Sequence, residues 1–416
     1  MSTAGTNSAP LMRLMKVPAG KIKKMASVLI VVENLPVPLD RRVWQEALAL
    51  RDLGYDVAVV CPKMRGYTEP FEILEGIRIY RHWITGEAGG MIGFAAEYSS
   101  ALIGEALCIF KAWRHTPFDV IHLCNPPDIL FLNALPYKLL AKTRVVFDVH
   151  DIWPEMFEAK YGTKNIIYHA VRLAERCTLA LADVVIATNE SVLSSVTSRG
   201  NLGADSTFVV RTSPNAINTS AKTVPERKNN RKFLVGYIGV MGSADGLEYL
   251  LRAIEHIVKT IGRNDISFCL MGSGAEWENL TKLRNSLEIQ DFTEMPGRVS
   301  DEYLAETLAT MDLGVACDPI NSYNDHCTMN KTLEYMAFGK AQVMFGIKEG
   351  RISAGQAASY VDENSPELLA LEICHLLDNP ELRQEMGRIG VDRIQGSLSW
   401  RNSVKNLEQA YALALR

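Results

Sequence analysis

Short apolar runs alternate with longer stretches of mixed polarity from residue 27 onward. Apolar runs bounded by turn residues are typical of buried strands, and the amphipathic stretches between them are typical of helices. In the first half of the chain the predicted strands are Ser27–Val32, Val57–Cys61, Val120–Leu123, Arg144–Val149 and Val184–Thr188. A helix is predicted from about Arg41 to Leu53, with Asp40 as its N-cap and Gly54 at its end. Strands separated by helices form right-handed βαβ units, which predicts a parallel sheet.

A second series of the same kind begins after Asn215–Arg231, a polar stretch rich in Lys and Arg that we interpret as an interdomain linker. Its predicted strands are Phe233–Gly239, Ile266–Gly272, Leu313–Cys317 and Ala341–Phe345. The pattern predicts an α/β fold of two doubly wound, Rossmann-like domains facing a cleft, over residues 27–218 and 219–395. Residues 396–416 then form an amphipathic helix.

Composition and charge exclude several other classes of protein. The 416 residues include 48 acidic and 44 basic side chains, a net charge of −4, and 47% are hydrophobic. These values are ordinary for a globular protein, exclude a disordered chain and argue against a nucleic-acid partner. The eight cysteines form no C-x-x-C pair and mostly lie in apolar runs, so we expect reduced core thiols in a cytoplasmic protein.

Two segments are examined as candidates for contact with a membrane, residues 1–26 and Met91–His115. No run of 18 apolar residues lacks charge, and the basic segment 1–26 lacks the apolar stretch of a signal peptide. We expect a disordered tail there, the alternative being weak attraction to an anionic membrane face. The segment Met91–His115 is apolar and nearly uncharged, which predicts a buried helix. The alternative is a surface that meets a lipid-linked substrate.

Candidate chemistry follows the ends of two strands in the first half. The first strand leads into a Pro-rich loop without G-x-G-x-x-G, which disfavours a dinucleotide site. Arg41 and Arg42 open the next helix, either as surface charges or facing a phosphate or sugar. After Arg144–Val149 come His150, Asp151 and Glu155, with Asp148 inside the strand. A metal is disfavoured because no companion ligand cluster stands out, and His150 is either a proton-handling group or a structural histidine.

Two glycine-rich turns follow strands of the second half. They contain Gly239, Gly242, Gly272 and Gly274. Glycine lets backbone N–H groups approach an anion closely, although plain turns use the same residue.

A predicted helix at about Met329–Phe338 places Lys331 and Glu334 on one face near its start. A helix N-terminus with a Lys favours a diphosphate, and a Glu one turn inward can accept hydrogen bonds from two ribose hydroxyls. A surface Lys–Glu pair explains the spacing equally well.

Together these segments resemble the retaining, nucleotide-sugar-dependent glycosyltransferases of family 4, which have the GT-B fold. The resemblance extends from Ser27 to the last helix. Each of its motifs is weakly specific alone, and the resemblance depends on their order along the chain. These are LPVPLDRRVWQEALALRDLGYDVAVVCP, FDVIHLCNPPD, FDVHDIWPE, GYIGVMGSADGLEYLLRAI, LMGSGAEWENL, PGRVSDEYLAETLATMDLGV and TMNKTLEYMAFGKAQV. It implies a donor nucleotide mainly in the second domain, an acceptor in the first, no cofactor or metal, and a last helix that crosses back to the first domain.

The resemblance also implies roles for individual residues. Glu334 matches the second Glu of the family's E-x7-E motif, on the donor ribose, and Lys331 matches the basic residue near the diphosphate. His150 matches a histidine near the transferred sugar, Gly272 and Gly274 match the turn beside the nucleotide, and Arg298 lies in the loop that flanks the base. We add Asn330 to the donor side, and we assign Arg41, Arg42, Asp151 and Glu155 to the acceptor side.

Two departures from the family pattern concern the donor. The first Glu of the E-x7-E motif falls at His326, with Asp325 beside it, and the usual basic pair after the first strand of the second domain falls at about Val240 and Asp245. Diphosphate neutralisation must then depend on Lys331, on helix N-termini and on Arg351 in the Gly-rich segment Lys348–Gly355.

The sequence therefore predicts a retaining glycosyltransferase that moves a sugar from a nucleoside diphosphate sugar to a hydroxyl. The expected acceptor is a saccharide or lipid-linked saccharide of cell-surface polysaccharide or glycolipid synthesis, reached in the cytoplasm or at the inner face of the membrane. Two alternatives stay open: a sugar-nucleotide epimerase of the same fold, and a non-catalytic sugar-nucleotide-binding subunit, which His326 in place of Glu suggests.

Overall fold

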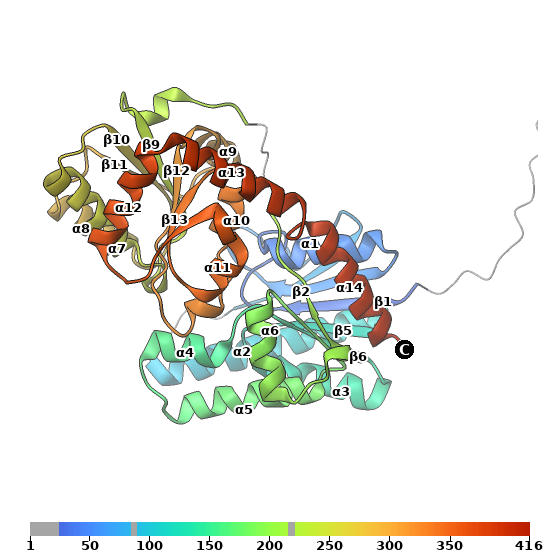
Figure 1. Cartoon of the computed structure of the whole chain (residues 1–416). Helices are drawn as coiled ribbons and strands as arrows, with labels where there is room; N and C mark the ends of the chain where they lie inside the picture. Colours follow the sequence, from blue (N-terminus) through green and yellow to red (C-terminus); the bar gives the residue numbers. More distant parts are fainter. Residues whose placement is uncertain (1–24, 85–89, 215–220) are drawn as a thin grey trace, which may run out of the picture.

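A computed structural model describes residues 25–84, 90–214 and 221–416, without the side chains of 90–98 and 160–161. Two separate sheets, each covered by helices, form the two halves of the molecule (Figure 1). The predictions for residues 1–24, and the start of the predicted linker at 215–220, lie outside the described residues.

The first sheet has eight strands in the order β3-β4-β2-β1-β5-β6-β7-β8. Their bounds are β1 Ser27–Val32, β2 Asp56–Pro62, β3 Phe71–Leu74, β4 Ile77–His82, β5 Val120–Cys124, β6 Arg144–Val149, β7 Val184–Ala187 and β8 Thr207–Val209. Neighbouring strands are parallel except β3 and β4, which pair antiparallel. The five strands predicted from apolar runs are confirmed. Strands β3, β4 and β8 escaped prediction because they are short or carry charged residues such as Arg78 and Arg81.

The second sheet has six parallel strands in the order β11-β10-β9-β12-β13-β14. Their bounds are β9 Phe233–Val240, β10 Ile266–Ser273, β11 Thr293–Gly297, β12 Leu313–Ala316, β13 Gln342–Phe345 and β14 Ala358–Val361. The four predicted strands are the four inner ones. The unpredicted β11 and β14 are short edge strands, which bury fewer side chains and so carry a weaker apolar signal.

Helices cover both faces of each sheet. In the first half they are α1 Arg41–Asp52, α2 Gly90–His115, α3 Phe131–Ala141, α4 Trp153–Tyr161, α5 Ile166–Leu181 and α6 Glu190–Gly200. In the second half they are α7 Leu247–Glu255, α8 Trp277–Ser286, α9 Asp301–Thr310, α10 Asn330–Ala337, α11 Lys348–Ala354, α12 Pro366–Asp378 and α13 Pro380–Gln395. Asp40 caps α1 as predicted, since its Oδ1 accepts a hydrogen bond of 3.0 Å from the Val43 N–H.

The last helix, α14 Trp400–Ala414, returns from the second half and packs on the first (Figure 1). Leu407 and Tyr411 are fully buried in the core that β1 and α1 share. The hydroxyl of Ser403 donates to the Arg211 carbonyl at 2.9 Å. The predicted fold class is therefore confirmed, including the crossing of the final helix.

The remaining physical predictions concern cysteines and membrane spans. All eight cysteines are free thiols, and six of them are buried. In the described parts of the chain, no helix has both the length and the apolar character needed to cross a bilayer.

Candidate active site

A cavity of about 630 Å³ lies between the two halves, at the carboxyl ends of strands from both sheets. In parallel α/β proteins this is where ligands bind. The predicted site residues on its wall are Arg41, Asp151, Gly239, Gly272, Arg298, Asn330, Lys331 and Glu334. Residues that the sequence predicted separately for the donor and the acceptor side are thus brought to one cavity.

Gly239 and Gly272 are the second-last residues of the adjacent strands β9 and β10, and both have φ angles near +150°. A Cβ at Gly272 would lie 1.8 Å from the Gly239 carbonyl oxygen, so a side chain cannot fit there. A Cβ at Gly274 would lie 2.4 Å from the Met241 carbonyl oxygen. Gly239 and Gly272 line the cavity, whereas Gly242 and Gly274 shape the turns behind it and are not on its wall.

Lys331 is buried at the start of α10. Its Nζ donates to both oxygens of Asp318, at 2.7 and 3.0 Å, and lies 3.8 Å from Asp245. Burial disfavours the charged form, but Asp318 and Asp245 outweigh it and raise the pKa of Lys331 above its usual value. The ammonium is therefore permanently charged, and two carboxylates already compensate that charge.

Glu334, one turn further along α10, forms an ion pair with the other half of the molecule. Arg41 Nη1 at the start of α1 donates to Glu334 Oε1 at 2.9 Å. Burial raises the pKa of Glu334 to about 7, although Arg41 opposes this shift. Lys331 and Glu334 are both buried and have separate partners, so the interpretation as a surface Lys–Glu pair is wrong.

A second cavity of about 540 Å³ adjoins the first. Asp151, Asn330 and Glu334 belong to the walls of both cavities, while His150 and Thr188 line the second. Tyr323 from the second half reaches across and donates to Asp151 Oδ1 at 3.0 Å. The two cavities form two adjoining spaces, one mostly on the second half and one mostly on the first.

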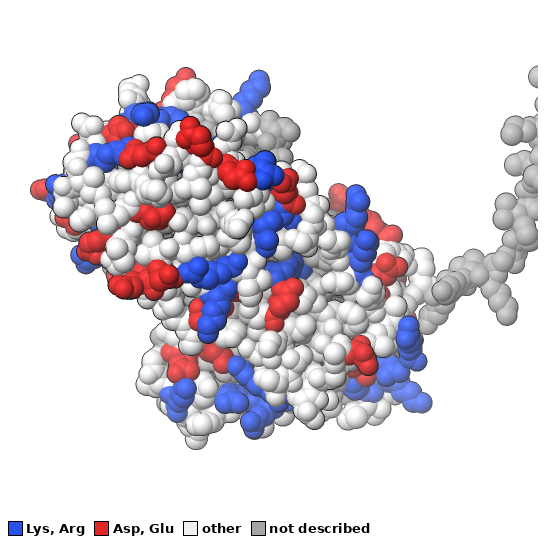
Figure 2. All heavy atoms as spheres, in the orientation of Figure 1, with Lys and Arg blue, Asp and Glu red and all other residues white. Residues whose placement is uncertain are grey.

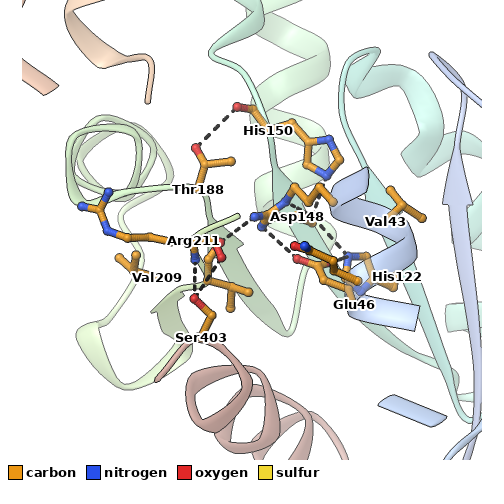
Figure 3. A network of polar contacts seen from close by, with 12 residues as sticks. Val43, Glu46, His122, Asp148, His150, Thr188, Val209, Arg211 and Ser403 are labelled. Carbon is orange, nitrogen blue, oxygen red and sulfur yellow. Dashed lines mark hydrogen bonds and ion pairs between the residues drawn. The ribbon is translucent and has the colours of Figure 1, made fainter. Parts of the chain in front are cut away.

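His150 is held from behind by a buried ion pair (Figure 3). Its Nε2 lies 2.6 Å from Asp148 Oδ2, and its backbone N–H donates to Asn125 Oδ1 at 2.7 Å. Arg42 donates to both Asp148 oxygens, at 2.9 and 2.5 Å. Burial lowers the pKa of His150, but Asp148 outweighs it and the pKa is raised. Arg42 lies on the wall of the second cavity, as its predicted place on the acceptor side requires, while its guanidinium is bound to Asp148 and the Val210 carbonyl.

The network continues into the core of the first half (Figure 3). His122 Nε2 lies 3.6 Å from both Glu46 Oε2 and Asp148 Oδ2, and its Nδ1 lies 2.7 Å from the Tyr411 hydroxyl. Burial raises the pKa of Glu46 to about 8 and lowers the pKa of His122. The sequence analysis did not select Glu46, His122 or Tyr411. Two signals were available: His122 is a titratable residue within the apolar strand VIHLC, and Glu46 is one on the apolar face of α1.

One buried group, His122, Cys124 and Asp148, has three potential metal-ligand atoms within 4.8 Å of one another. Asp148 already binds Arg42 and His150, and a divalent cation would have to displace the guanidinium. Burial also raises the pKa of the Cys124 thiol well above its usual value, which disfavours the thiolate that a metal requires. This donor set does not fit a divalent cation.

Four other predicted site residues do not reach either cavity. Asp325 accepts from the Lys348 N–H at 3.1 Å, and His326 Nδ1 lies 2.9 Å from the Ser322 carbonyl oxygen. Arg351 pairs with Asp362, and Glu155 pairs with Arg199.

The predicted donor loop Lys348–Gly355 is mostly the helix α11. Its fully buried Glu349 contacts the first half of the molecule, through Ser191 Oγ at 2.6 Å and Arg211 Nη1 at 3.1 Å. The structure thus places this segment in the contact between the halves rather than on the wall of either cavity, so its predicted place in the donor site stays a prediction.

Arg65 also lies on the cavity wall and was not among the predicted site residues. It follows the carboxyl end of β2 and is exposed, as is Arg298 on the other half. Within the described ranges, neither Arg65 nor Arg298 makes an ion pair. The position of Arg65 after a strand end is a signal that could have found it.

Comparisons with known proteins agree with this geometry. A family model described as glycosyl transferase 4-like domain matches residues 39–212, and one described as glycosyl transferases group 1 matches residues 232–379. An uncharacterised glycosyltransferase of Methanocaldococcus jannaschii is 23% identical over 193 residues, 46% of this chain. The match spans about half of that relative, 47% of its length.

Solved structures with the same fold are much more distant in sequence. Sucrose-phosphate synthase of Thermosynechococcus elongatus has a TM-score of 0.74 at 16% identity, over 93% of this chain and 98% of that chain. The Anabaena protein HepE, solved in complex with UDP-glucose, has a TM-score of 0.68 at 13% identity, over 93% of this chain and 99% of that chain.

Proposed function

Because the chain belongs to the group 1, family-4-like glycosyltransferases with the GT-B fold, we propose that it transfers a sugar from a nucleoside diphosphate sugar to a hydroxyl acceptor with retained anomeric configuration. The observation that supports this most is the cavity between the halves. It joins the glycine turns, Lys331 and Glu334 of one half to Arg41 and Asp151 of the other. Within the proposal, the donor occupies the larger cavity and the acceptor enters the second, beside His150.

On the donor side, Glu334 accepts hydrogen bonds from the ribose hydroxyls after the donor displaces Arg41 from its Oε1. The diphosphate lies against Lys331 and the N-terminus of α10, where ammonium and backbone N–H groups favour an anion. Since Asp318 and Asp245 already compensate Lys331, the unpaired guanidinium groups of Arg65 and Arg298 supply the remaining positive charge.

The chemical step needs stabilisation of the departing diphosphate more than a protein nucleophile. The acceptor oxygen attacks the anomeric carbon from the face that the diphosphate leaves, and the bond from that carbon to the phosphate oxygen breaks. The acceptor proton passes to the leaving phosphate oxygen. His150, oriented by Asp148, holds a hydroxyl of the transferred sugar.

Saccharides or lipid-linked saccharides at the inner face of the membrane are the acceptors we propose. A protein that acts on donor alone, as an epimerase would, does not need the second cavity.

A donor screen tests the proposal. Melting temperature is measured with UDP-, GDP- and dTDP-sugars, and a donor at 100 times its Kd stabilises the protein by about 2.7 kcal/mol. Sugar transfer to an acceptor in the presence of that donor supports the proposal. Interconversion of the donor without an acceptor, followed by NMR, contradicts it, as does binding of no donor in calorimetry.

A further inference from the structure

The segment 125–128, Asn-Pro-Pro-Asp, follows β5 and has no role in the proposed function. On the face of the molecule that Figure 2 shows, positive and negative side chains are mixed over both halves. Asn125 and Asp128 are instead polar side chains of the interior, 2% and 1% exposed. Because burial of a polar side chain costs free energy unless it is hydrogen-bonded, its partners indicate what the side chain stabilises.

Asn125 binds the backbone of the turn that carries His150 and Asp151. Its Oδ1 accepts from the His150 N–H at 2.7 Å and from the Asp151 N–H at 3.3 Å. Its Nδ2 donates to the Asp151 carbonyl at 2.8 Å. One side chain therefore binds three backbone groups of two successive residues. A longer contact of 3.5 Å joins the Thr188 hydroxyl to the His150 carbonyl.

A fourth hydrogen bond anchors Asn125 itself. Its Nδ2 also donates to Asp128 Oδ1 at 2.9 Å, and the Asp128 carbonyl accepts from the Thr178 hydroxyl on α5. A carboxamide has two lone pairs and two N–H donors, so all four hydrogen-bonding positions of Asn125 are used. Rotation of the amide by half a turn would place its NH₂ against two backbone N–H groups, so these partners fix its orientation. The turn is thus connected through Asn125 and Asp128 to α5.

This turn carries two side chains that matter for the proposed site. His150 Nε2 lies 2.6 Å from Asp148 Oδ2 (Figure 3), which leaves Nδ1 as the ring nitrogen for a ligand in the second cavity. Asp151, the next residue, accepts from the Tyr323 hydroxyl of the second half at 3.0 Å. Asp148 holds only one end of the imidazole, so the position of Nδ1 also depends on the backbone of His150.

We propose that Asn125 is a positioning residue, which fixes the turn so that His150 meets Asp148 on one side and a sugar hydroxyl on the other. This inference rests on the proposed function for the role of His150. Neither Asn125 nor Asp128 is among the residues that line the two cavities, so Asn125 acts through His150. An apolar residue at position 125 would leave three backbone groups without their partner, and the turn would move to find others.

The first test follows the titration of His150 by NMR in the protein without any sugar. Histidines are labelled with ¹⁵N, and the His150 signals are those missing from His150→Gln. The pKa of His150 should fall in Asn125→Ala toward its ordinary value of about 6.5, because the ring loses its contact with Asp148. Asn125→Ala is neutral and changes none of the titratable or charged groups that act on the ring, which are Asp40, Arg42, Glu46, His122, Asp148 and Asp151.

Asn133→Ala is the matched control. Asn133 on α3 is a partly buried asparagine of the same half, and its Nδ2 donates to the Leu102 carbonyl at 3.2 Å and to Glu105 Oε2 at 3.1 Å. Its loss should lower the melting temperature but leave the titration of His150 unchanged, because its partners belong to α2 rather than to the turn.

Asp128 provides a second pair of variants if Asn125→Ala does not fold. Asp128→Ala removes the anchor of Asn125, whereas Asp128→Asn keeps an oxygen that can accept the same hydrogen bond. Burial raises the pKa of Asp128 to about 8, so below that pH the wild-type side chain is neutral, as asparagine is. We expect the pKa of His150 to fall less in Asp128→Ala than in Asn125→Ala, and to stay at its wild-type value in Asp128→Asn.

The second test is sugar transfer with the donor that the melting-temperature screen identifies. Asn125→Ala should lower kcat about 10²-fold, because a displacement of about 1 Å at a group that contacts the substrate has that effect. The KM for the donor should stay unchanged, since Asn125 does not line the larger cavity. Asn133→Ala should keep both values.

Three outcomes overturn the proposal. The first is a titration of His150 that is the same in wild type, Asn125→Ala and Asp128→Ala. The second is an equal fall of the His150 pKa in Asn133→Ala. The third is an unchanged kcat in a variant whose His150 titration has shifted. If the wild-type chain transfers no sugar, the proposed function fails, whereas the titration still decides whether Asn125 orients His150.

Discussion

The two halves of the molecule treat buried charge in different ways. In the second half, Lys331 and Glu334 lie on the wall of a cavity, and a ligand can compete for each of their partners. In the first half, Asp148 and Glu46 are fully buried beside Arg42, and Arg42 and His150 are the members of this network that reach the second cavity. The comparison leads us to propose that similar Asp-bound cations serve binding in the second half, where Lys331 faces the larger cavity, and rigidity in the first, where the network of Arg42 extends into the core.

The largest expected effect tests this division directly. Asp148→Ala removes the carboxylate that binds the buried Arg42 guanidinium and leaves it beside Glu46, whose pKa is raised. Because Arg42 then lacks a full counter-charge, we expect a loss of about 3–5 kcal/mol in the free energy of unfolding. Asp318→Ala should cost much less, because Asp245 and water in the cavity still stabilise the Lys331 ammonium. Chemical denaturation of both variants measures the difference, and equal losses would show that the two halves do not differ in this way.

The second prediction moves to the cavity wall. Lys331→Ala should lower kcat about 10²–10³-fold at saturating donor, a typical result of removing one group that stabilises the leaving charge. The melting temperature should change little, because Asp318 and Asp245 can be solvated from the cavity. Lys348→Ala, at an exposed lysine bound to Asp325, is the control and should keep full turnover. Unchanged turnover in Lys331→Ala contradicts the assignment of Lys331.

The third prediction concerns pH. Burial raises the pKa of Glu46 to about 8 from an unfolded value near 4.5, so the folded chain retains a proton that the unfolded chain loses. The contribution of Glu46 is therefore fully present below about pH 4.5 and is lost as pH rises toward 8. Relative to wild type, Glu46→Gln should gain about 3–4 kcal/mol between pH 5 and pH 8. If the free energy of unfolding depends on pH in the same way in both proteins, burial does not raise the pKa of Glu46 and the prediction is contradicted.

The smallest effect tests the link between the last helix and the network. Tyr411→Phe removes the hydroxyl that contacts His122 Nδ1 and should cost about 1–2 kcal/mol of unfolding free energy, because a buried polar group loses its partner. Tyr55→Phe is the control, since the Tyr55 ring packs on Tyr411 at 5.4 Å and is partly exposed. Equal losses in the two variants would show that the hydroxyl contact between Tyr411 and His122 contributes nothing beyond that of a partly exposed tyrosine hydroxyl.

Local signals explain which parts of the site could be predicted from sequence. The spacing of Lys331 and Glu334 on one helix, and the position of His150 just after β6, depend on neighbours in the chain. The inner strands were also predictable, because burial on both faces produces continuous apolar runs.

Other parts depend on residues that are far apart in the chain. Tyr411 meets His122 across 289 positions, and Arg41 meets Glu334 across 293, which no local pattern reveals. Arg351 illustrates a local signal that long-range contacts outweigh in this structure. Glycine and basic residues suggested a ligand loop, but buried Glu349 fixes that segment as a helix between the halves.

The return of α14 to the first half has a consequence for how the chain is made. Leu407, Ala410 and Tyr411 complete a core whose other members, such as Val28 and Val43, are synthesised first. Since proteins are made from the N-terminus, the first half cannot close its core on the ribosome until the last residues emerge. We infer that premature termination within the final helix leaves the early-made half, rather than the late-made one, with an exposed core.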